Sequence, residues 1–559
     1  MLRDVVAGFL DTVTEREFDA PLLTLLAARG FTDIHFLHGK YEFGKDVIAQ
    51  GLKPLDGDTG TGDPATWALH QYSIQSKAGN IGLPEWRAVR PQIDEARLDD
   101  LAHPDFDPDL PRAAVLLTTG RLTGGAPVEA GSYLQAELRR GRPGFETWDR
   151  EHLLDWLVTS PEAGLAGTSD GPILALAGAI DAGQITYADL ERRARAWLPP
   201  VPGTLTAATE PPAEITARLR RAAIEAAVLG NRLRRSGRLD LAALSALLLL
   251  RAAWCHALYI TPDSAPSRPE MAAAAIRMFV GYAEALLDQT EPVAKDPRAM
   301  LTAVSPFTFA HASYPAACVR IAEILGLLGL LADGAAPDVT GGLCLESART
   351  ARIVKDLLAC QPGCAHPVSD GYAVSLIAPV LLTARRDLEE ARDFLTQAAV
   401  WIADWYDPEH GGIGLAGPAA DPDSEVAHLL GAPFDNSPAP RPGSYAATVL
   451  TDIAALLPGS AELYEDLVNE FLAAGADPQL LQADELRAQW RPDGTGVTLI
   501  PRISYAEPLP PDDTAAAHYA APEPPVPAWD ALALTSVTRD RHVVAVLRAA
   551  LGEIGELPG

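Results

Sequence analysis

The chain has 559 residues, 48% of them hydrophobic, which excludes a disordered protein and predicts a globular one of about two to four domains. Its net charge of −29 argues against a protein that holds nucleic acid by charge alone, because an acidic surface repels the phosphate backbone. Five cysteines in a chain of this length argue against a disulfide framework.

The N-terminal part alternates between helix and strand patterns, in the order helix, two strands, helix, strand, and a last strand that leads into a helix. These elements are predicted at Glu15–Ala28, after Gly44-Lys45-Asp46, around Gln75-Ser76-Lys77, at Trp86–Arg97, before Thr118-Thr119-Gly120, and at Phe145–Leu157. The stretch Lys53–Thr66 is rich in Gly, Asp and Pro, and we interpret it as a loop inserted at a hairpin tip.

In this order, the elements up to Leu157 resemble the Mrr-type branch of the PD-(D/E)xK nuclease superfamily, the fold of type IV restriction endonucleases. The resemblance implies an α/β restriction-endonuclease-like domain, which we expect at residues 1–165. Gln75 stands where most of the superfamily has Asp or Glu, as it does in Mrr-type members. The spacing between Asp46 and Gln75 is also longer than the family pattern leads us to expect.

Three side chains carry the predicted chemistry. Gln75 and Lys77 lie two positions apart, so on a strand both point to the same face of the sheet. Together with the Asp46 carboxylate they offer an acid, an amide oxygen and an ammonium group, which can hold a divalent metal and a hydrolytic water. The backbone carbonyl of Ser76 is expected to complete the metal shell. Hard oxygen ligands of this kind suit Mg²⁺ or Mn²⁺.

Further residues are candidates for the same site. The resemblance implies an additional acidic ligand on the first helix, either Asp19, which follows Phe18, or Glu17; a solvated helix face explains both equally well. We expect substrate contacts from Lys45, Arg87, Arg90 and Gln92. On so acidic a chain, DNA binding needs a local basic strip. The candidates for that strip are Arg87, Arg90 and Arg97, followed by Arg139, Arg140 and Arg142.

The remainder of the chain is predicted to be helical. A helical connector at residues 166–197 and a Pro-rich linker at 198–213 precede an all-α regulatory or interaction domain at 214–559, which carries a Pro-rich strap at about 505–527. Apolar residues at helical spacing predict an α-solenoid or compact helical array without a strict repeat. The predicted helices are Glu214–Arg235, Leu239–Tyr259, Arg268–Leu287, Tyr314–Ala332, Leu345–Ala359, Asp387–Trp405, Tyr445–Leu457, Ala461–Ala474 and Thr538–Leu551.

Two further patterns bear on metals and membranes. Cys360 and Cys364, followed by His366, have the spacing of half a zinc site, but no second half follows, so ordinary thiols are expected. The longest apolar runs, Leu241–Leu250 and Ile324–Ala332, are shorter than a bilayer span, and the first residues do not form a signal peptide. We therefore expect a cytoplasmic protein with no membrane partner.

The sequence leaves more than one function open. The first hypothesis is a Mg²⁺-dependent endonuclease that cleaves DNA in restriction or antiphage defence, with the helical region as sensor, oligomerisation surface or regulator. The alternative is a catalytically inactive nuclease-like scaffold that binds a protein or nucleic-acid partner through its helical region, and the negative charge favours it. RNA cleavage uses the same metal chemistry. No phosphate-binding Gly-Lys-Ser/Thr loop is present, so ATP use is not indicated.

Overall fold

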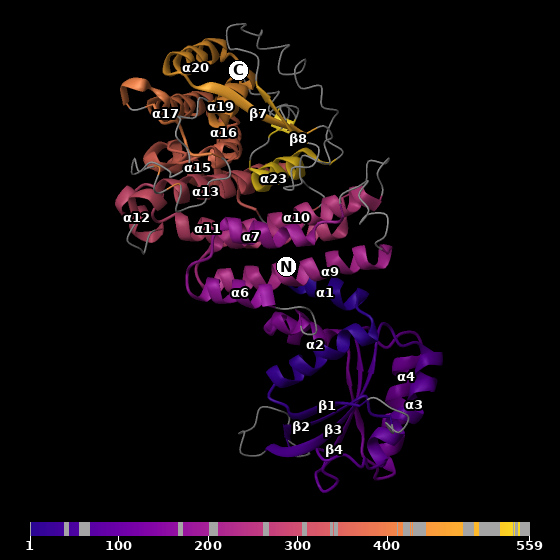
Figure 1. The fold of residues 1–559 in the computed structure, drawn as a ribbon. Coiled ribbons are helices and arrows are strands. Elements are labelled where there is room, and N and C mark those ends of the chain that lie inside the picture. Colours follow the sequence, from indigo (N-terminus) through magenta and orange to yellow (C-terminus); the bar gives the residue numbers. More distant parts are fainter. Residues whose placement is uncertain are drawn as a thin grey trace. The chain divides into compact units, whose positions relative to one another are not determined.

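A computed structural model of the chain divides into two compact units (Figure 1). Unit 1 comprises Met1–Ala175 with Ala223–Val228, and unit 2 comprises Leu176–Ala222 with Leu229–Gly559. The structure describes residues 2–37, 44–54, 67–165, 171–200, 211–260, 268–304, 310–335, 339, 345–410, 412–417, 425, 428, 443–483, 497–501, 526–539, 542, 546–547 and 550. Lys53 and Pro54, the first two residues of the predicted hairpin-tip loop, belong to strand β2 (Val47–Pro54). The rest of that loop, most of the Pro-rich linker and most of the Pro-rich strap lie outside the described residues.

Unit 1 begins with two helices, α1 (Leu2–Thr12) and α2 (Glu15–Ala28). The side chain of Thr14 accepts a hydrogen bond from the backbone N–H of Glu17, and the Glu17 carboxylate accepts one from the backbone N–H of Thr14. This capping box satisfies two amide groups that would otherwise lack partners at the start of α2. The predicted bounds of α2 are confirmed.

A mixed five-stranded sheet forms the centre of unit 1, with strand order β1-β2-β3-β4-β5. The strands are β1 (Thr32–Phe36), β2 (Val47–Pro54), β3 (Trp67–Lys77), β4 (Arg112–Thr118) and β5 (Phe145–Trp148). The pairs β1–β2 and β2–β3 are antiparallel, whereas β3–β4 and β4–β5 are parallel. The parallel pairs are connected through α3 (Leu83–Leu98) and α4 (Ala126–Arg139), and α5 (Arg150–Thr159) follows β5.

Each face of this sheet packs against its own hydrophobic core. Val47 and Ile74 belong to the core that contains Phe18 of α2, and we call this side of the sheet the α2 face. Leu116 belongs to the core that contains Trp86 of α3, and we call this side the α3 face. Figure 1 shows α3 and α4 along one side of the sheet and α2 on the other. Ile74 points to the α2 face. Since successive strand residues point to opposite faces, Gln75 and Lys77 point to the α3 face.

Unit 2 is mostly helical, and consecutive helices such as α10 and α11 pack against one another. Its main helices are α7 (Tyr187–Ala194), α9 (Pro212–Arg235), α10 (Leu239–Ile260), α11 (Glu270–Thr290), α12 (Pro297–Val304), α13 (Ala310–Leu330), α15 (Ser347–Cys360), α16 (Ile377–Ala384), α17 (Leu388–Tyr406), α19 (Tyr445–Leu456), α20 (Ala461–Ala474) and α23 (Ala528–Thr538). The short helix η6 covers Asp370–Leu376, and α6 (Gly171–Asp181) crosses the division between the units.

The all-α prediction for residues 214–559 is wrong in one part. Strands β6 (Gly443–Ser444), β7 (Asp477–Ala483) and β8 (Val497–Pro501) form a small sheet in the order β6-β7-β8. The β-branched residues Val497, Thr498 and Ile500 favour an extended chain, and pairing with β7 satisfies its backbone groups. Helix α23 was not predicted either. It ends at Thr538, and the next residue, Arg539, has a left-handed conformation with φ 68°. Most of the predicted closing helix lies outside the described residues.

Two helices among the described residues are long and apolar enough to cross a membrane, Leu239–Ile260 and Tyr314–Gly334. Their apolar windows are 94% and 78% buried inside the protein. A helix that is hydrophobic on all sides is expected in the core of a large helical unit. The two helices are therefore weak evidence for a membrane.

Candidate functional site

Asp46 forms hydrogen bonds with two residues that lie 29 and 30 positions later in the sequence. Its Oδ2 atom accepts a hydrogen bond from the backbone N–H of Ser76 at 2.7 Å and another from Nε2 of Gln75 at 2.5 Å. The antiparallel register explains the meeting, because Val47 lies opposite Ile74, so the residue before Val47 faces the residue after Ile74. The structure thus brings together three of the predicted metal ligands.

The Ser76 carbonyl also turns toward Asp46. The Ile74 carbonyl accepts from the Asp46 N–H at 2.9 Å, whereas the Lys77 carbonyl accepts from the Thr119 N–H at 3.1 Å. Residues 74 and 77 therefore direct their backbone groups toward opposite neighbouring strands. The N–H and carbonyl of one strand residue point to the same side, and the Ser76 N–H points to Asp46.

Gly44 allows the chain to enter β2 close to α3. Its φ angle is +69°, and a Cβ atom at this position would lie 2.0 Å from the carbonyl oxygen of Gln92. A side chain is excluded on both grounds, by backbone strain and by collision with the α3 backbone. Glycine at this position therefore sets the path that delivers Asp46 to the end of the sheet.

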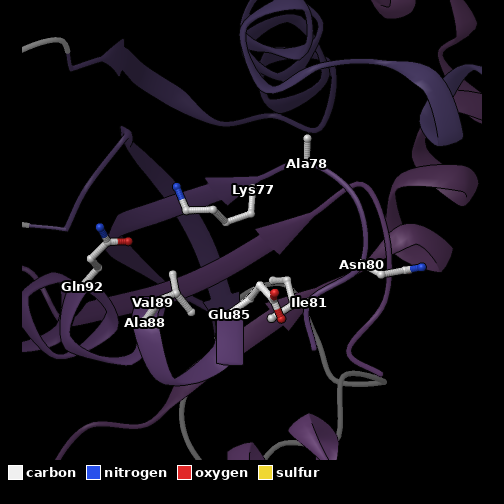
Figure 2. Close-up of a pocket in the computed structure, with 8 residues that line it drawn as sticks. All are labelled: Lys77, Ala78, Asn80, Ile81, Glu85, Ala88, Val89 and Gln92. Carbon is white, nitrogen blue, oxygen red and sulfur yellow. The ribbon is translucent and has the colours of Figure 1, made fainter. Parts of the chain in front are cut away.

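Lys77 lies at the end of β3 and lines a pocket of about 290 Å³ (Figure 2). The pocket is lined by Lys77, Ala78, Asn80, Ile81, Glu85, Ala88, Val89 and Gln92. Figure 2 shows the side chains of Lys77 and Gln92 on the same side of the pocket, with Asn80 on the other. Gln92 is thus the predicted substrate contact that the structure does place beside Lys77.

The acid beside Lys77 is neither of the two that the sequence suggested. Oε1 of Glu15 lies 3.4 Å from Nζ of Lys77, while the carboxylate of Glu17 is engaged in the capping box of α2. Asp19 follows Glu15 by one helical turn and therefore shares its side of the helix. The Thr14-x-x-Glu17 pattern is a capping-box signature, so the role of Glu17 could have been recognised in the sequence. Glu85, which lines the pocket, is another acid that sequence reasoning missed.

Lys45 was predicted to contact the substrate, but the structure buries its side chain. Its side chain is fully buried, Nζ donates to the backbone carbonyl of Glu95 at 3.2 Å, and Nζ lies 5.9 Å from the ring centroid of Phe106. A side chain closed off from solvent does not reach a bound substrate. Burial and the nearby charge of Arg112 lower the pKa of Lys45 to about 8.

This pKa makes the stability of unit 1 depend on pH. Since the pKa of Lys45 falls from its ordinary 10.5 to about 8 on folding, the unfolded chain binds a proton between these values that the folded chain lacks. The free energy of unfolding should therefore rise as pH increases from about 8 to about 10.5. We expect Lys45→Met to raise stability at neutral pH by about 2–3 kcal/mol and to abolish this rise, measured by urea denaturation. A control Lys53→Met variant should keep the rise.

Most of the arginines proposed for a basic strip are paired with acids, whereas Arg90 lies over the Tyr133 ring and Arg139 donates to the Gln135 carbonyl. Arg87 contacts Glu129 at 2.9 Å, and the guanidinium of Arg90 lies 5.4 Å from the ring centroid of Tyr133. Arg97 is buried against Glu137 at 3.1 Å. Arg140 and Arg142 bind the same Glu137 carboxylate, at 2.6 and 3.3 Å. Because the charges of Arg87, Arg97, Arg140 and Arg142 are paired with Glu129 or Glu137, these four residues contribute less to a basic strip than the sequence suggested.

No family model, curated protein or solved structure matches this chain. Cys360, Cys364 and His366 are not part of the candidate metal-ligating group found among the described residues. The one group of metal-ligating side chains found within the described part of the chain is His35, His103 and Asp105, which the sequence did not suggest.

Proposed function

We propose that unit 1 is a metal-dependent endonuclease that hydrolyses phosphodiester bonds in DNA. The observation that carries the proposal is the meeting of Asp46, Gln75 and Ser76, with Lys77 next to them on β3 at the mouth of a pocket. The order of helices and strands also agrees with the order that the resemblance implies. By that resemblance, the protein acts in the cytoplasm in restriction or antiphage defence.

The donors fit a hard divalent cation. The Asp46 carboxylate, the Gln75 side-chain carbonyl and the Ser76 backbone carbonyl are oxygen ligands, which Mg²⁺ and Mn²⁺ prefer. Such an ion supplies charge stabilisation at the scissile phosphate and lowers the pKa of a bound water. The Gln75 amide nitrogen faces Asp46, and a half-turn about the Cγ–Cδ bond exchanges it for the oxygen.

The other pocket residues act directly on the substrate in this proposal. The Lys77 ammonium group holds the attacking water and offsets negative charge that develops on the phosphate. Glu15, which lies beside the pocket, pairs with Lys77, with Oε1 at 3.4 Å from Nζ. Gln92 donates a hydrogen bond to a phosphate oxygen from the side of the pocket on which Lys77 lies.

Plasmid cleavage tests the proposal. The purified full chain is expected to nick supercoiled plasmid in the presence of Mg²⁺ or Mn²⁺, and to stop when a chelator removes the metal. Methylated and unmethylated plasmids are compared, since the resemblance leaves modification dependence open. An equal amount of Asp46→Ala protein should not nick either plasmid. Folded wild-type protein that leaves DNA and RNA intact under all of these conditions would count against an enzyme.

Gln75→Glu should separate metal binding from folding. The substitution places a second carboxylate 2.5 Å from Asp46, so the two like charges repel each other when no metal is bound. We expect a lower melting temperature without metal and a larger rise on addition of Mg²⁺ than in the wild type, measured by differential scanning calorimetry. A Gln92→Glu variant, which lies in the pocket but outside the ligand set, should show no such enlarged response.

A nuclease-like scaffold without catalysis is the second candidate. It is favoured by the net charge of −29 and by the pairing of Arg97, Arg140 and Arg142 with Glu137. On this account, unit 2 recruits a protein or nucleic-acid partner and unit 1 does not cut. In the nuclease account, unit 2 acts as sensor, oligomerisation surface or regulator. Binding of a partner without any metal-dependent cleavage would decide for the scaffold.

A further inference from the structure

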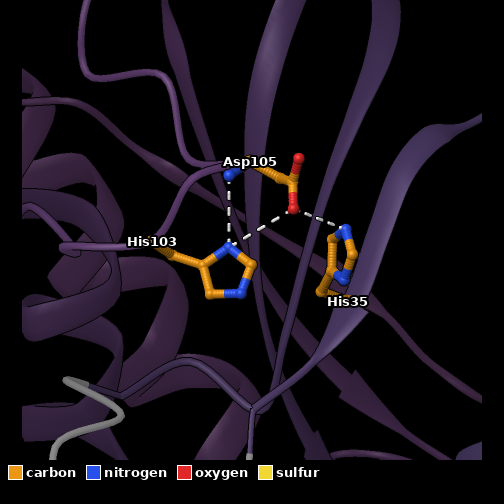
Figure 3. A group of neighbouring side chains, drawn as sticks. All are labelled: His35, His103 and Asp105. Atoms are coloured by element: carbon orange, nitrogen blue, oxygen red, sulfur yellow. Dashed lines mark hydrogen bonds and ion pairs between the residues drawn. The ribbon is translucent and has the colours of Figure 1, made fainter.

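His35, His103 and Asp105 form a cluster in unit 1 (Figure 3). His35 lies on the edge strand β1, and the other two lie on the segment between α3 and β4. Nε2 of His35 is 2.8 Å from Oδ2 of Asp105, and Nδ1 of His103 is 3.7 Å from the same oxygen. One ligand atom from each residue lies within 4.8 Å of the other two.

We propose that these three residues bind a transition-metal ion, with Zn²⁺ as the expected occupant. Two imidazoles and one carboxylate are donors that Zn²⁺ and Co²⁺ prefer, unlike the oxygen set at Asp46. In a tetrahedral zinc site, ligand atoms lie about 2.0–2.2 Å from the metal and therefore about 3.3 Å from one another. The two measured separations, 2.8 and 3.7 Å, fall on either side of this value. The described residues supply three protein ligands, and water would fill a remaining position.

The protonation pattern suits metal binding. The backbone N–H of Asp105 donates to Nδ1 of His103 at 3.2 Å, so this nitrogen carries no hydrogen, and a metal ion bound there would replace this hydrogen bond. The His35 nitrogen donates to Asp105 in the absence of metal, and a metal ion would displace that hydrogen. Because binding releases a proton, occupancy of the site should fall as the solution becomes more acidic.

The segment that carries His103 and Asp105 is anchored directly after Asp105. Phe106 is buried, and the guanidinium of Arg112 lies 5.2 Å from its ring centroid. The backbone N–H of Asp107 donates to Oε1 of Gln71 on β3 at 2.9 Å. These contacts fix the backbone next to Asp105, so less ordering is needed when a metal binds.

A metal at this position would join the segment to strand β1. Phe106 of the same segment lies against Lys45, the residue that precedes Asp46. Phe106 therefore links the proposed zinc site to Lys45, the residue directly before the proposed catalytic acid Asp46. We infer a structural role, in which bound Zn²⁺ holds residues 99–111 and 32–36 together.

Metal binding by the full chain tests the inference. Metal is first removed from the protein with a chelator. The protein is then dialysed against Zn²⁺ or Co²⁺ in a large excess of Mg²⁺, because Mg²⁺ occupies sites made of oxygen ligands alone. The bound Zn²⁺ or Co²⁺ per chain is then measured. The wild type is expected to bind Zn²⁺, and His35→Ala, His103→Ala and Asp105→Asn should each lose one equivalent. His152→Ala is the matched control, since His152 also pairs with an aspartate, at 2.9 Å, but has no third ligand among the described residues. Cys364→Ser, which removes one thiol of the Cys360–Cys364 pair, should bind as much Zn²⁺ as the wild type.

Hydrogen exchange supplies a second readout. Zn²⁺ should slow exchange of backbone amides in residues 99–111 of the wild type and of His152→Ala, and should leave His35→Ala unchanged. Circular dichroism checks that each variant is folded. The inference is overturned if the wild type binds no Zn²⁺ or Co²⁺, or if the three ligand variants bind as much as the wild type. An Asp46→Ala protein should bind zinc normally, so failure of the nuclease proposal would not affect this result.

Discussion

Replacement of Lys77 by alanine is expected to lower the rate of plasmid cleavage by about 10²–10³-fold while DNA binding stays nearly constant. The reason is that a charge placed where negative charge develops stabilises the transition state more than the bound substrate. Single-turnover cleavage of supercoiled plasmid at saturating enzyme measures the rate, and a gel-shift assay in Ca²⁺ measures binding.

Lys53→Ala is the matched control for this substitution. Both lysines lie on the β2–β3 hairpin, both pair with a glutamate, and their side chains are 32% and 36% exposed. Lys53 binds Glu146 at 2.7 Å and does not line the pocket. The Lys53 variant should therefore cleave at the wild-type rate. An equal loss of cleavage rate in both variants would mean that the effect comes from the removal of any positive charge on this hairpin. Cleavage by Lys77→Ala at the wild-type rate would show that Lys77 takes no part in the mechanism.

Glu323→Ala is expected to destabilise unit 2 by about 3–5 kcal/mol. Glu323 of α13 is fully buried, and its carboxylate accepts hydrogen bonds from Arg320 at 2.9 Å, from Ser375 at 2.8 Å and from Arg539 at 3.4 Å. Without this carboxylate, two buried guanidinium groups face each other with no compensating charge between them. Thermal and urea denaturation followed by circular dichroism measure the loss.

The same residue should confer sensitivity to acid. Burial alone would raise the pKa of Glu323, but the charges of Arg539 and Arg320 outweigh it and hold the pKa below its ordinary 4.5. The stabilisation is therefore present above pH 4.5 and is lost as the pH falls further. Glu323→Gln should flatten this part of the stability profile. Glu291→Ala is the control, because Glu291 binds Arg349 and Arg352 at the surface, and its loss should have a much smaller effect.

The sequence predicted the local structure of unit 1 well. Apolar spacing placed α2 at its observed bounds, and the period of two put Gln75 and Lys77 on one face of β3. The caps of α2 and α7, at Thr14 and Thr186, are local signals of the same kind. These features depend on residues that are close to one another in the sequence, so the local sequence pattern is enough to predict them.

Features that depend on distant segments were missed. The burial of Lys45 comes from Phe106 and the Glu95 carbonyl, which reach it only after the sheet and α3 have assembled. Glu15 is one of several acids on α2, and only the packing of this helix selects it as the neighbour of Lys77. The same reason hides the cluster of His35, His103 and Asp105, whose members share no sequence motif.

The meeting of Asp46, Gln75 and Ser76 at a metal ion is the central claim, and diffraction from crystals grown with Mn²⁺ tests it most directly. The proposal predicts an anomalous peak about 2.2 Å from an Asp46 carboxylate oxygen, the Gln75 side-chain oxygen and the Ser76 carbonyl. Ordered crystals with Mn²⁺ bound elsewhere, and with Gln75 and Ser76 still hydrogen-bonded to Asp46 as in the metal-free protein, would contradict it.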